Sequence, residues 1–307
     1  MRLIVLFSGQ GGLRREHVLR LRASAPPDVA EPLRAALRLL DVQTAALTEA
    51  QWAANRLAQP LICAYQLALW RELAPLLPSP VLVAGYSLGE LAAFACAGAF
   101  SPGDAVTLAY ERARLMDEAT AEPSGLLAVL GLDEAQLRAR SAASGTEIAI
   151  RNGPRHFIVG GTRRALAVLA REATLAGATR TTMLCVTTPS HTGVLKAAAV
   201  RFAGYLRPCL RDRMDVPVLS GVEAQIVRGD AAVAAVLERQ ICTRLDWVAC
   251  METLLEHRPD AVLELGPGNA LAKMLLELEP QAEVRAVDEF RDLRAAAQWV
   301  GSRRQSV

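Results

Sequence analysis

The sequence predicts an α/β fold, in which a large domain surrounds a mostly parallel sheet and carries a smaller, inserted α+β subdomain. Short apolar runs that end at a small residue, such as LIVLF (residues 3–7) and VLVAG (81–85), are typical of buried parallel strands. Helical stretches alternate with these runs, as in α/β proteins. Between residues 123 and 189 the expected order changes to β-α-β-β-α-β, the ferredoxin-like pattern.

The large domain begins with the strand at residues 3–7, and a helical region follows from Ser24 to Leu77. A strand at 81–84 leads into a small-residue helix after Ser87. Another helix begins after SPGD (101–104), where a serine or aspartate can cap it. The later expected elements are a helix at 193–205, strands at 216–222, 261–266 and 284–287 separated by helices, and a frayed tail from Arg303.

The inserted subdomain is expected to span residues 123–189, so that the large domain comprises residues 1–122 and 190–307. Its strands are short apolar runs, and helical stretches separate the first from the second and the third from the fourth. The expected strands are 126–132, 147–152, 157–161 and 181–186, and the expected helices are 133–144 and 163–176.

The composition favours a globular protein with a sizeable core. Of the 307 residues 52% are hydrophobic, and the net charge of +2 indicates no surface for nucleic acid. The apolar run at 81–100 is interrupted by Glu90 and predicts a core strand and helix instead of a membrane span. The opening run at 3–7 is too short for a signal peptide. These features predict a cytoplasmic protein with no membrane partner.

Six cysteines are present, and none has C-x-x-C spacing. We expect them to be buried free thiols in a reducing compartment. They are Cys63, Cys96, Cys185, Cys209, Cys242 and Cys250.

The stretch GYSLGE (85–90) has the G-x-S-x-G pattern between an expected strand and an expected helix. A sharp turn there exposes Ser87 at the top of the sheet, and Gly85 and Gly89 lack the Cβ atoms that would clash. The helix N-terminus also aims N–H groups beside Ser87, and the N–H of Leu88 is the natural first donor to an oxyanion. This context predicts a nucleophile. The alternative is a serine that only caps the helix.

A serine nucleophile needs a base, and the chain has four histidines. His17 lies in the charged run RREH and is expected to be solvated. His156 starts an expected strand of the insert, and His257 ends an amphipathic helix in a solvent-facing place. His191 follows TTPS and opens an expected helix, whose N-terminus keeps the ring neutral, as a base must be. His191 is therefore the predicted base, and a packed or capping histidine is the alternative.

Helical spacing places Arg112 on the apolar face of the helix that begins after residue 101, and Arg114 on the opposite face. A guanidinium that points inward needs an anion, because an unpaired buried charge is very costly. The anion is either a protein carboxylate or a substrate carboxylate held bidentately. The sequence leaves both alternatives open.

Three signals occur in a fixed order: Gly-Gln-Gly at 9–11, the serine turn with Arg112 25 residues after Ser87, and Pro-Ser-His at 189–191. This set resembles the malonyl-CoA:acyl carrier protein transacylase family, and the likeness extends to the insert and to GPG at 266–268. The resemblance implies an α/β hydrolase-like large domain. It also implies ping-pong transfer of a malonyl group from malonyl-CoA to the thiol of an acyl carrier protein, with no metal or bound cofactor.

The resemblance implies a role for each matching position. Ser87 would be the acylated nucleophile and His191 its base. Gln10 would supply the second oxyanion N–H. Arg112 would bind the free carboxylate of the malonyl group, and the main-chain carbonyl of Gln240 would hold the histidine.

Two positions depart from the common pattern of that family. Ser8 stands where most members have proline, and Tyr86 stands where they have histidine. FSGQGG with GYSLGE looks more like the malonyltransferase subunit of bacterial malonate decarboxylase. That resemblance implies a carrier protein bearing a phosphoribosyl-dephospho-CoA group, with other decarboxylase subunits as further partners.

Other functions compete with this interpretation. The same transacylase could serve fatty acid or polyketide synthesis. An α/β-hydrolase esterase would need a base near the C-terminus, where only His257 fits. A patatin-like lipase would use a Ser–Asp dyad with Asp-Gly, a dipeptide that the sequence lacks. A non-catalytic carrier-docking module is disfavoured by the presence of both Ser87 and His191.

Overall fold

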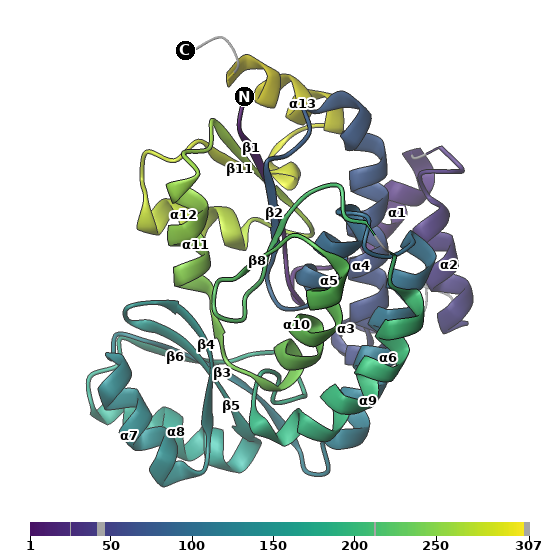
Figure 1. Ribbon diagram of the computed structural model, residues 1–307. Coiled ribbons are helices and arrows are strands. Elements are labelled where there is room, and N and C mark those ends of the chain that lie inside the picture. The colour runs from purple at the N-terminus through teal and green to yellow at the C-terminus, as the bar shows by residue number, and fades with distance from the viewer. Residues whose placement is uncertain (25, 42–46, 212, 304–307) are drawn as a thin grey trace.

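The computed structural model describes residues 1–24, 26–41, 47–211 and 213–303, and the predicted frayed tail falls mostly outside them. Within these residues two sheets form the framework (Figure 1). The large sheet has six strands in the order β11-β10-β1-β2-β7-β8, and the small sheet has five in the order β6-β3-β5-β4-β9. This is the mixed α/β fold that the sequence predicts.

The large sheet brings the ends of three strands together. β1 (Leu3–Phe7) pairs in parallel with β2 (Leu82–Gly85) and with β10 (Ala261–Leu265). Phe7 stands opposite the last residue of both neighbours, so the loops after these strands emerge at one edge of the sheet. The remaining strands are β7 (Val218–Leu219), β8 (Ile226–Val227) and β11 (Val284–Ala286), of which only β8 runs antiparallel to its neighbour.

Alternate residues of β1 face two apolar cores. Leu3, Val5 and Phe7 belong to the larger core, and Ile4 and Leu6 to the second. The second core is closed by α11 (Trp247–Glu256), α12 (Ala270–Leu278) and one face of the small sheet. The larger core is closed by α1 (Arg15–Ser24), α2 (Glu31–Leu40), α3 (Glu49–Ala53), α4 (Asn55–Leu73), α5 (Leu88–Cys96), α6 (Pro102–Ala119), α9 (Lys196–Leu206), α10 (Asp230–Cys242) and α13 (Leu293–Ser302).

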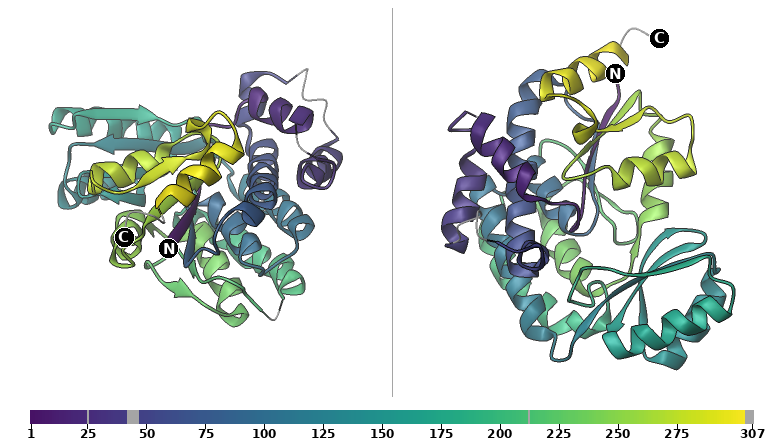
Figure 2. Two further views of the ribbon diagram at one scale, coloured as in Figure 1. Left: turned by 90° about the horizontal axis from the view of Figure 1, so that it is seen from above. Right: turned by 180° about the vertical axis from the view of Figure 1, so that it is seen from behind.

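The small sheet contains the predicted ferredoxin-like order. Its elements are β3 (Ser124–Leu130), α7 (Glu134–Ser144), β4 (Glu147–Gly153), β5 (His156–Thr162), α8 (Arg163–Leu175) and β6 (Arg180–Met183). These elements gather at one end of the molecule (Figure 2). A fifth strand, β9 (Leu245–Asp246), comes from the later part of the chain and pairs in parallel with β4. The small sheet is therefore built from two separate stretches of sequence.

Several elements differ from the sequence prediction. α1 precedes the predicted helical region, because Val18 and Leu21 of the charged run pack into the larger core. The strand predicted at 181–186 ends at Met183, where the chain leaves the sheet toward the histidine loop. The strand predicted at 216–222 is only two residues long, since the chain turns into β8 directly after it.

All six cysteines are free, but only Cys63 and Cys250 are buried. The prediction of buried thiols is therefore wrong for the other four. Cys185 is exposed because it lies in the loop after β6 and not in a strand. Among the described residues, no helix combines the length and the apolar character needed to cross a bilayer.

Candidate active site

Ser87 lies at a sharp turn between β2 and α5, with φ 53° and ψ −114°. Positive φ is costly for a residue other than glycine and persists only where the surrounding structure imposes it. A Cβ at Gly85 would lie 2.1 Å from the nitrogen of Glu90, and one at Gly89 would lie 2.1 Å from the carbonyl oxygen of Phe7. Both glycines are therefore required for the turn that places Ser87 at the sheet edge.

The Ser87 hydroxyl contacts His191, with 2.7 Å between Oγ and Nε2. On the other side of the ring, Nδ1 lies 2.6 Å from the main-chain carbonyl oxygen of Gln240. A carbonyl only accepts hydrogen bonds, so Nδ1 carries the proton and Nε2 accepts from the serine. The main-chain N–H of His191 also donates to the carbonyl of Ile241 at 2.9 Å. The end of α10 thus holds both the ring and the backbone of His191.

His191 is 1% exposed, and burial lowers the pKa of its ring to about 3. The charge of Arg112 lowers this pKa further, while the hydrogen bond to Gln240 raises it. The ring is therefore neutral at pH 7. The predicted cause, a helix N-terminus, is wrong, because a 3-10 turn (η3, Gly193–Leu195) follows His191 and α9 begins only after it.

Two main-chain N–H groups near Ser87, those of Leu88 and Gln10, donate no hydrogen bond within the described residues. Leu88 is the first residue of α5, where the helix dipole adds positive potential. The loop after β1, which carries Gln10, runs against the serine turn. A Cβ at Gly9 would lie 2.7 Å from the carbonyl oxygen of Tyr86 and 3.6 Å from the Cβ of Ser87. The two predicted oxyanion donors, one at the N-terminus of α5 and one on the loop after β1, therefore lie at the same edge of the sheet.

Arg112 is 3% exposed, on the inward face of α6 that its helical position predicts, whereas Arg114 pairs with glutamates of the same helix. Its terminal nitrogens donate to two amide oxygens, Gln59 Oε1 at 2.7 Å and Gln240 Oε1 at 3.0 Å. Within the described residues Arg112 forms no ion pair, and Glu90 acts on it electrostatically. Its hydrogen bonds are made to neutral amides, so within the described residues no carboxylate is bonded to the guanidinium.

Two buried residues of this site, Gln59 and Glu90, were not predicted from the sequence. Gln59 donates to Asn55 Oδ1 at 2.6 Å and to Gln10 Oε1 at 3.4 Å, and so links Arg112 to the loop after β1. Glu90 is fully buried. The available signal was a single polar side chain within an apolar helical run, because such a residue is seldom buried without a partner.

Ser87 makes no hydrogen bond to the other three histidines. His257 Nδ1 lies 3.0 Å from the carbonyl oxygen of Thr253 at the end of α11. His156 is the first residue of β5. The prediction that His17 is solvated is wrong: its side chain is 17% exposed, and Nε2 lies 3.1 Å from Asp288 Oδ2. The packing of α1 against the larger core brings His17 to this carboxylate.

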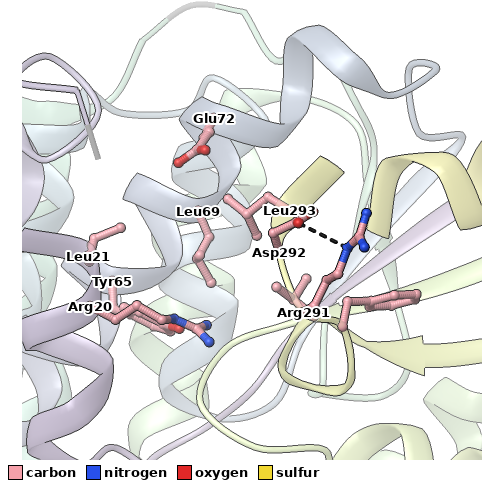
Figure 3. Close-up of a pocket in the computed structure, with 10 residues that line it drawn as sticks. Arg20, Leu21, Tyr65, Leu69, Glu72, Arg291, Asp292 and Leu293 are labelled. Atoms are coloured by element: carbon pink, nitrogen blue, oxygen red, sulfur yellow. Dashed lines mark ion pairs between the residues drawn. The ribbon is translucent and has the colours of Figure 1, made fainter. Parts of the chain in front are cut away.

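A cavity of about 900 Å³ opens beside Gln10, between the loop after β1, α3 and the loop after β6. Its walls include Trp52 and Leu184, and it also contacts Arg14 and Arg15, both exposed and without an ion pair in the described part of the chain. A second cavity of about 260 Å³ lies between α1, α4 and the segment before α13 (Figure 3). None of the predicted site residues lines this second cavity.

A family model matches most of the chain. The family model described as "Acyl transferase domain" matches residues 28–284. The chain belongs to this acyl transferase family.

Relatives of this acyltransferase are similar over most of their length. A malonyl CoA-acyl carrier protein transacylase from Salmonella typhimurium is 30% identical, covering 95% of this chain and 97% of the relative. One from Mycobacterium bovis is 33% identical, covering 90% and 91%. In a solved complex, a malonyl-transacylase bound to its type II PKS acyl-carrier protein matches with a TM-score of 0.89 at 27% identity, over 97% of this chain and 99% of that one.

Proposed function

We propose that this acyltransferase moves a malonyl group from malonyl-CoA to the thiol of an acyl carrier protein through a malonyl ester of Ser87. The observation that carries the proposal is the contact of Ser87 Oγ with a neutral, carbonyl-anchored His191, next to the buried guanidinium of Arg112. The two named transacylases that are similar over at least nine tenths of this chain support it.

The first half-reaction forms the acyl-enzyme. The malonyl carboxylate pairs with Arg112, and His191 Nε2 takes the Ser87 proton as Oγ attacks the thioester carbonyl. The N–H groups of Leu88 and Gln10 stabilise the oxyanion, each by about 3 kcal/mol on the usual mutational scale. The tetrahedral intermediate then collapses, the C–S bond breaks, and His191 returns its proton to the departing CoA sulfur.

The second half-reaction runs the same steps in reverse. The carrier thiol gives its proton to His191 as its sulfur attacks the malonyl ester. Collapse of this intermediate breaks the bond to Ser87 Oγ, which recovers the proton. The carbonyl of Gln240 holds the ring in one tautomer throughout and stabilises the transient imidazolium. A thioester is already reactive, so a carboxylate behind the histidine is not required.

The cavity beside Gln10 is the proposed path for the pantetheine arm. Its mostly apolar walls suit a flexible arm, and its volume of about 900 Å³ is within the usual range for ligand sites. Arg14 and Arg15 are the cationic groups proposed to meet the phosphates at the far end of the arm.

His191→Ala should slow acylation by malonyl-CoA about 10²–10⁴-fold, the usual worth of a general base. Because the folded-state pKa of His191 is about 3, the wild-type ring stays neutral from pH 5 upward, and its titration should cause no loss of acylation rate there. Single-turnover acylation across pH measures both effects. His257→Ala is the control, and an equal loss from it would favour the esterase alternative.

Incubation of the protein with malonyl-CoA, followed by intact-mass analysis, tests the proposal. A stable malonyl adduct that a carrier thiol removes is expected. Rapid release of free malonate instead would indicate an esterase. Absence of any adduct would indicate a non-catalytic docking module.

The named relatives support a transacylase of fatty acid or polyketide synthesis better than a malonate decarboxylase subunit. Ser8 and Tyr86 are what favour the decarboxylase carrier, and both make hydrogen bonds inside the protein. Gln66 Nε2 donates to the Ser8 carbonyl at 2.7 Å, and the Tyr86 hydroxyl lies 3.1 Å from Asn152 Oδ1. Ser8 is buried and Tyr86 is half-buried, and both are bonded within the protein, so neither gives a direct argument for a particular carrier. We retain the decarboxylase carrier only as the second candidate.

Discharge of the malonyl-enzyme by two carriers separates the candidates. Both carriers present a thiol on a long arm, so discrimination has to come from the cavity mouth. If the protein is a malonate decarboxylase subunit, the phosphoribosyl-dephospho-CoA carrier should discharge the malonyl-enzyme much faster than the phosphopantetheine carrier does. The difference between the two rates should become smaller as salt screens Arg14 and Arg15. Equal rates at low salt, or faster discharge by the phosphopantetheine carrier, would eliminate the second candidate and leave the serine chemistry intact.

A further inference from the structure

Glu90 is a buried carboxyl group that the proposed mechanism does not use. It lies in the first turn of α5, three residues after the nucleophile, and its side chain is 0% exposed. Its Oε2 accepts from Gln240 Nε2 at 3.1 Å and from the main-chain N–H of Gly221 at 3.3 Å. Its Oε1 makes no hydrogen bond of ordinary geometry within the described residues, although the side chain of Ser220 lies close enough to lower the pKa of the carboxyl group. A buried carboxyl oxygen without a donor is a natural place for a proton.

The side chain of Gln240 lies between Glu90 and Arg112. Its Nε2 donates to Glu90 Oε2 and, at 2.5 Å, to the carbonyl oxygen of Ser87. Its Oε1 accepts from the guanidinium of Arg112 at 3.0 Å. The amide dipole thus has its positive end toward a carboxyl group and its negative end toward a cation. The carboxyl group and the guanidinium are coupled through one amide.

We propose that the ionised form of Glu90 is the counter-charge of Arg112 in the empty site, and that docking of the acyl carboxylate on Arg112 is coupled to protonation of Glu90. The inference rests on the proposed function, since it needs an acyl group with a free carboxylate. With that carboxylate bound, the buried site would hold two anions and one cation, which is unfavourable at low dielectric. A proton on Glu90 Oε1 restores neutrality. Glu90 is therefore a specificity-determining positioning residue.

The charged and titratable groups around Glu90 set the pH range in which its carboxyl group changes charge. Burial raises the pKa of Glu90 to about 7, while hydrogen bonds from Ser220, Gln240 and Gly221 and the attraction of Arg112 on α6 lower it. Cys250 on α11 also interacts with Glu90, but burial and the charges of Glu90 and Asp246 raise the pKa of its thiol well above the ordinary value. His191, which contacts Gln240, stays neutral across this range. Glu90 is thus the group of this cluster that changes charge near pH 7.

The charge of Glu90 sets the direction in which the preference for malonyl changes with pH. Below pH 7 Glu90 is neutral, and the charge of Arg112 is free for the substrate carboxylate. Above pH 7 Glu90 is anionic and has to take up a proton before the acyl carboxylate docks. The preference for malonyl over acetyl should therefore be constant at low pH. It should fall by up to about tenfold per pH unit once Glu90 ionises.

The test is kcat/KM for malonyl-CoA and for acetyl-CoA from pH 5.5 to 9, compared as a ratio. Groups whose titration changes kcat/KM for both thioesters equally have no effect on this ratio. Wild type should show the fall above pH 7, and Glu90→Gln should show a flat ratio close to the low-pH wild-type plateau. Glu264→Gln is the matched control: Glu264 is equally buried, with a pKa also raised to about 7 by burial, but it accepts from Leu271 and Ala272 N–H groups at α12.

Two results would overturn the inference. One is a wild-type ratio that does not change with pH while both thioesters acylate Ser87, which leaves the proposed function standing. The other is a malonyl-to-acetyl ratio of Glu90→Gln that keeps the wild-type pH profile.

If Glu90→Gln does not fold, a proton count on the wild-type protein tests the inference. Malonyl-enzyme formation at pH 8 should take up close to one more proton than acetyl-enzyme formation, as reported by a pH indicator, and an equal proton count contradicts the coupling.

Discussion

Ser87→Ala should give a folded protein that forms no malonyl-enzyme and loses at least about 10⁴-fold in transfer rate, as in serine enzymes that lose their nucleophile. The loss is expected to be this large because His191 then has no hydroxyl to deprotonate, and no other group replaces the Oγ that lies 2.7 Å from Nε2. The fold should survive. The strained backbone at Ser87 is imposed by Gly85 and Gly89, and alanine adopts that backbone no worse than serine.

Intact-mass analysis after incubation with malonyl-CoA measures the Ser87→Ala result, with circular dichroism as the check on folding. Ser8→Ala is the matched control, because Ser8 is a second buried serine at the same sheet edge. That variant should still acquire the malonyl group. A malonyl adduct on Ser87→Ala would show that the nucleophile is another residue.

Arg112→Ala should reduce malonyl transfer by about 2–5 kcal/mol of transition-state stabilisation, the range for removing one partner of a desolvated charged contact. Acetyl-CoA has no carboxylate, so its transfer should be spared or rise relative to malonyl. The substitution also leaves Gln59 Oε1 and Gln240 Oε1 without their donor. That structural cost is common to both substrates, and the malonyl-to-acetyl ratio therefore isolates the part that belongs to substrate recognition.

Steady-state kcat/KM for both thioesters measures the Arg112→Ala effect. Arg114→Ala is the control on the same helix. Arg114 is 21% exposed and pairs with Glu111 and Glu118, so its loss should change stability slightly and leave the ratio unchanged. If Arg112→Ala lowers kcat/KM for both thioesters by the same factor, Arg112 is structural and the acyl carboxylate is recognised elsewhere.

Features that depend on local sequence could be predicted. The turn at Ser87 follows from two glycines placed where a Cβ has no room, and its flanking elements follow from apolar runs of the right length. The inward position of Arg112 follows from helical spacing alone, which separates it from Arg114 two residues later. The ferredoxin-like order of β3 to β6 follows from the succession of short strands and amphipathic helices.

Contacts between distant segments could not be predicted in this way. The fifth strand of the small sheet, β9, comes from residues 245–246 and has no local signal that ties it to β4. His17 looked solvated in its charged run, yet the packing of α1 brings it to Asp288, 271 residues away. The short histidine loop replaced a predicted helix start, so the cause of the neutral ring changed from a helix dipole to burial.

The sequence by itself determined the chemistry that one residue and its neighbours can define: a serine on a strained turn, an arginine on an apolar helical face, and a histidine after Pro-Ser. Only the tertiary structure decided how these parts act together. Gln240 contacts the Ser87 carbonyl, Glu90 and Arg112 with its side chain, and His191 with its main-chain carbonyl. These partners lie 49 to 153 residues from Gln240 along the chain. The physical reason is that burial removes water as a partner, so each polar group must bond to whatever the packing of sheets and helices places beside it.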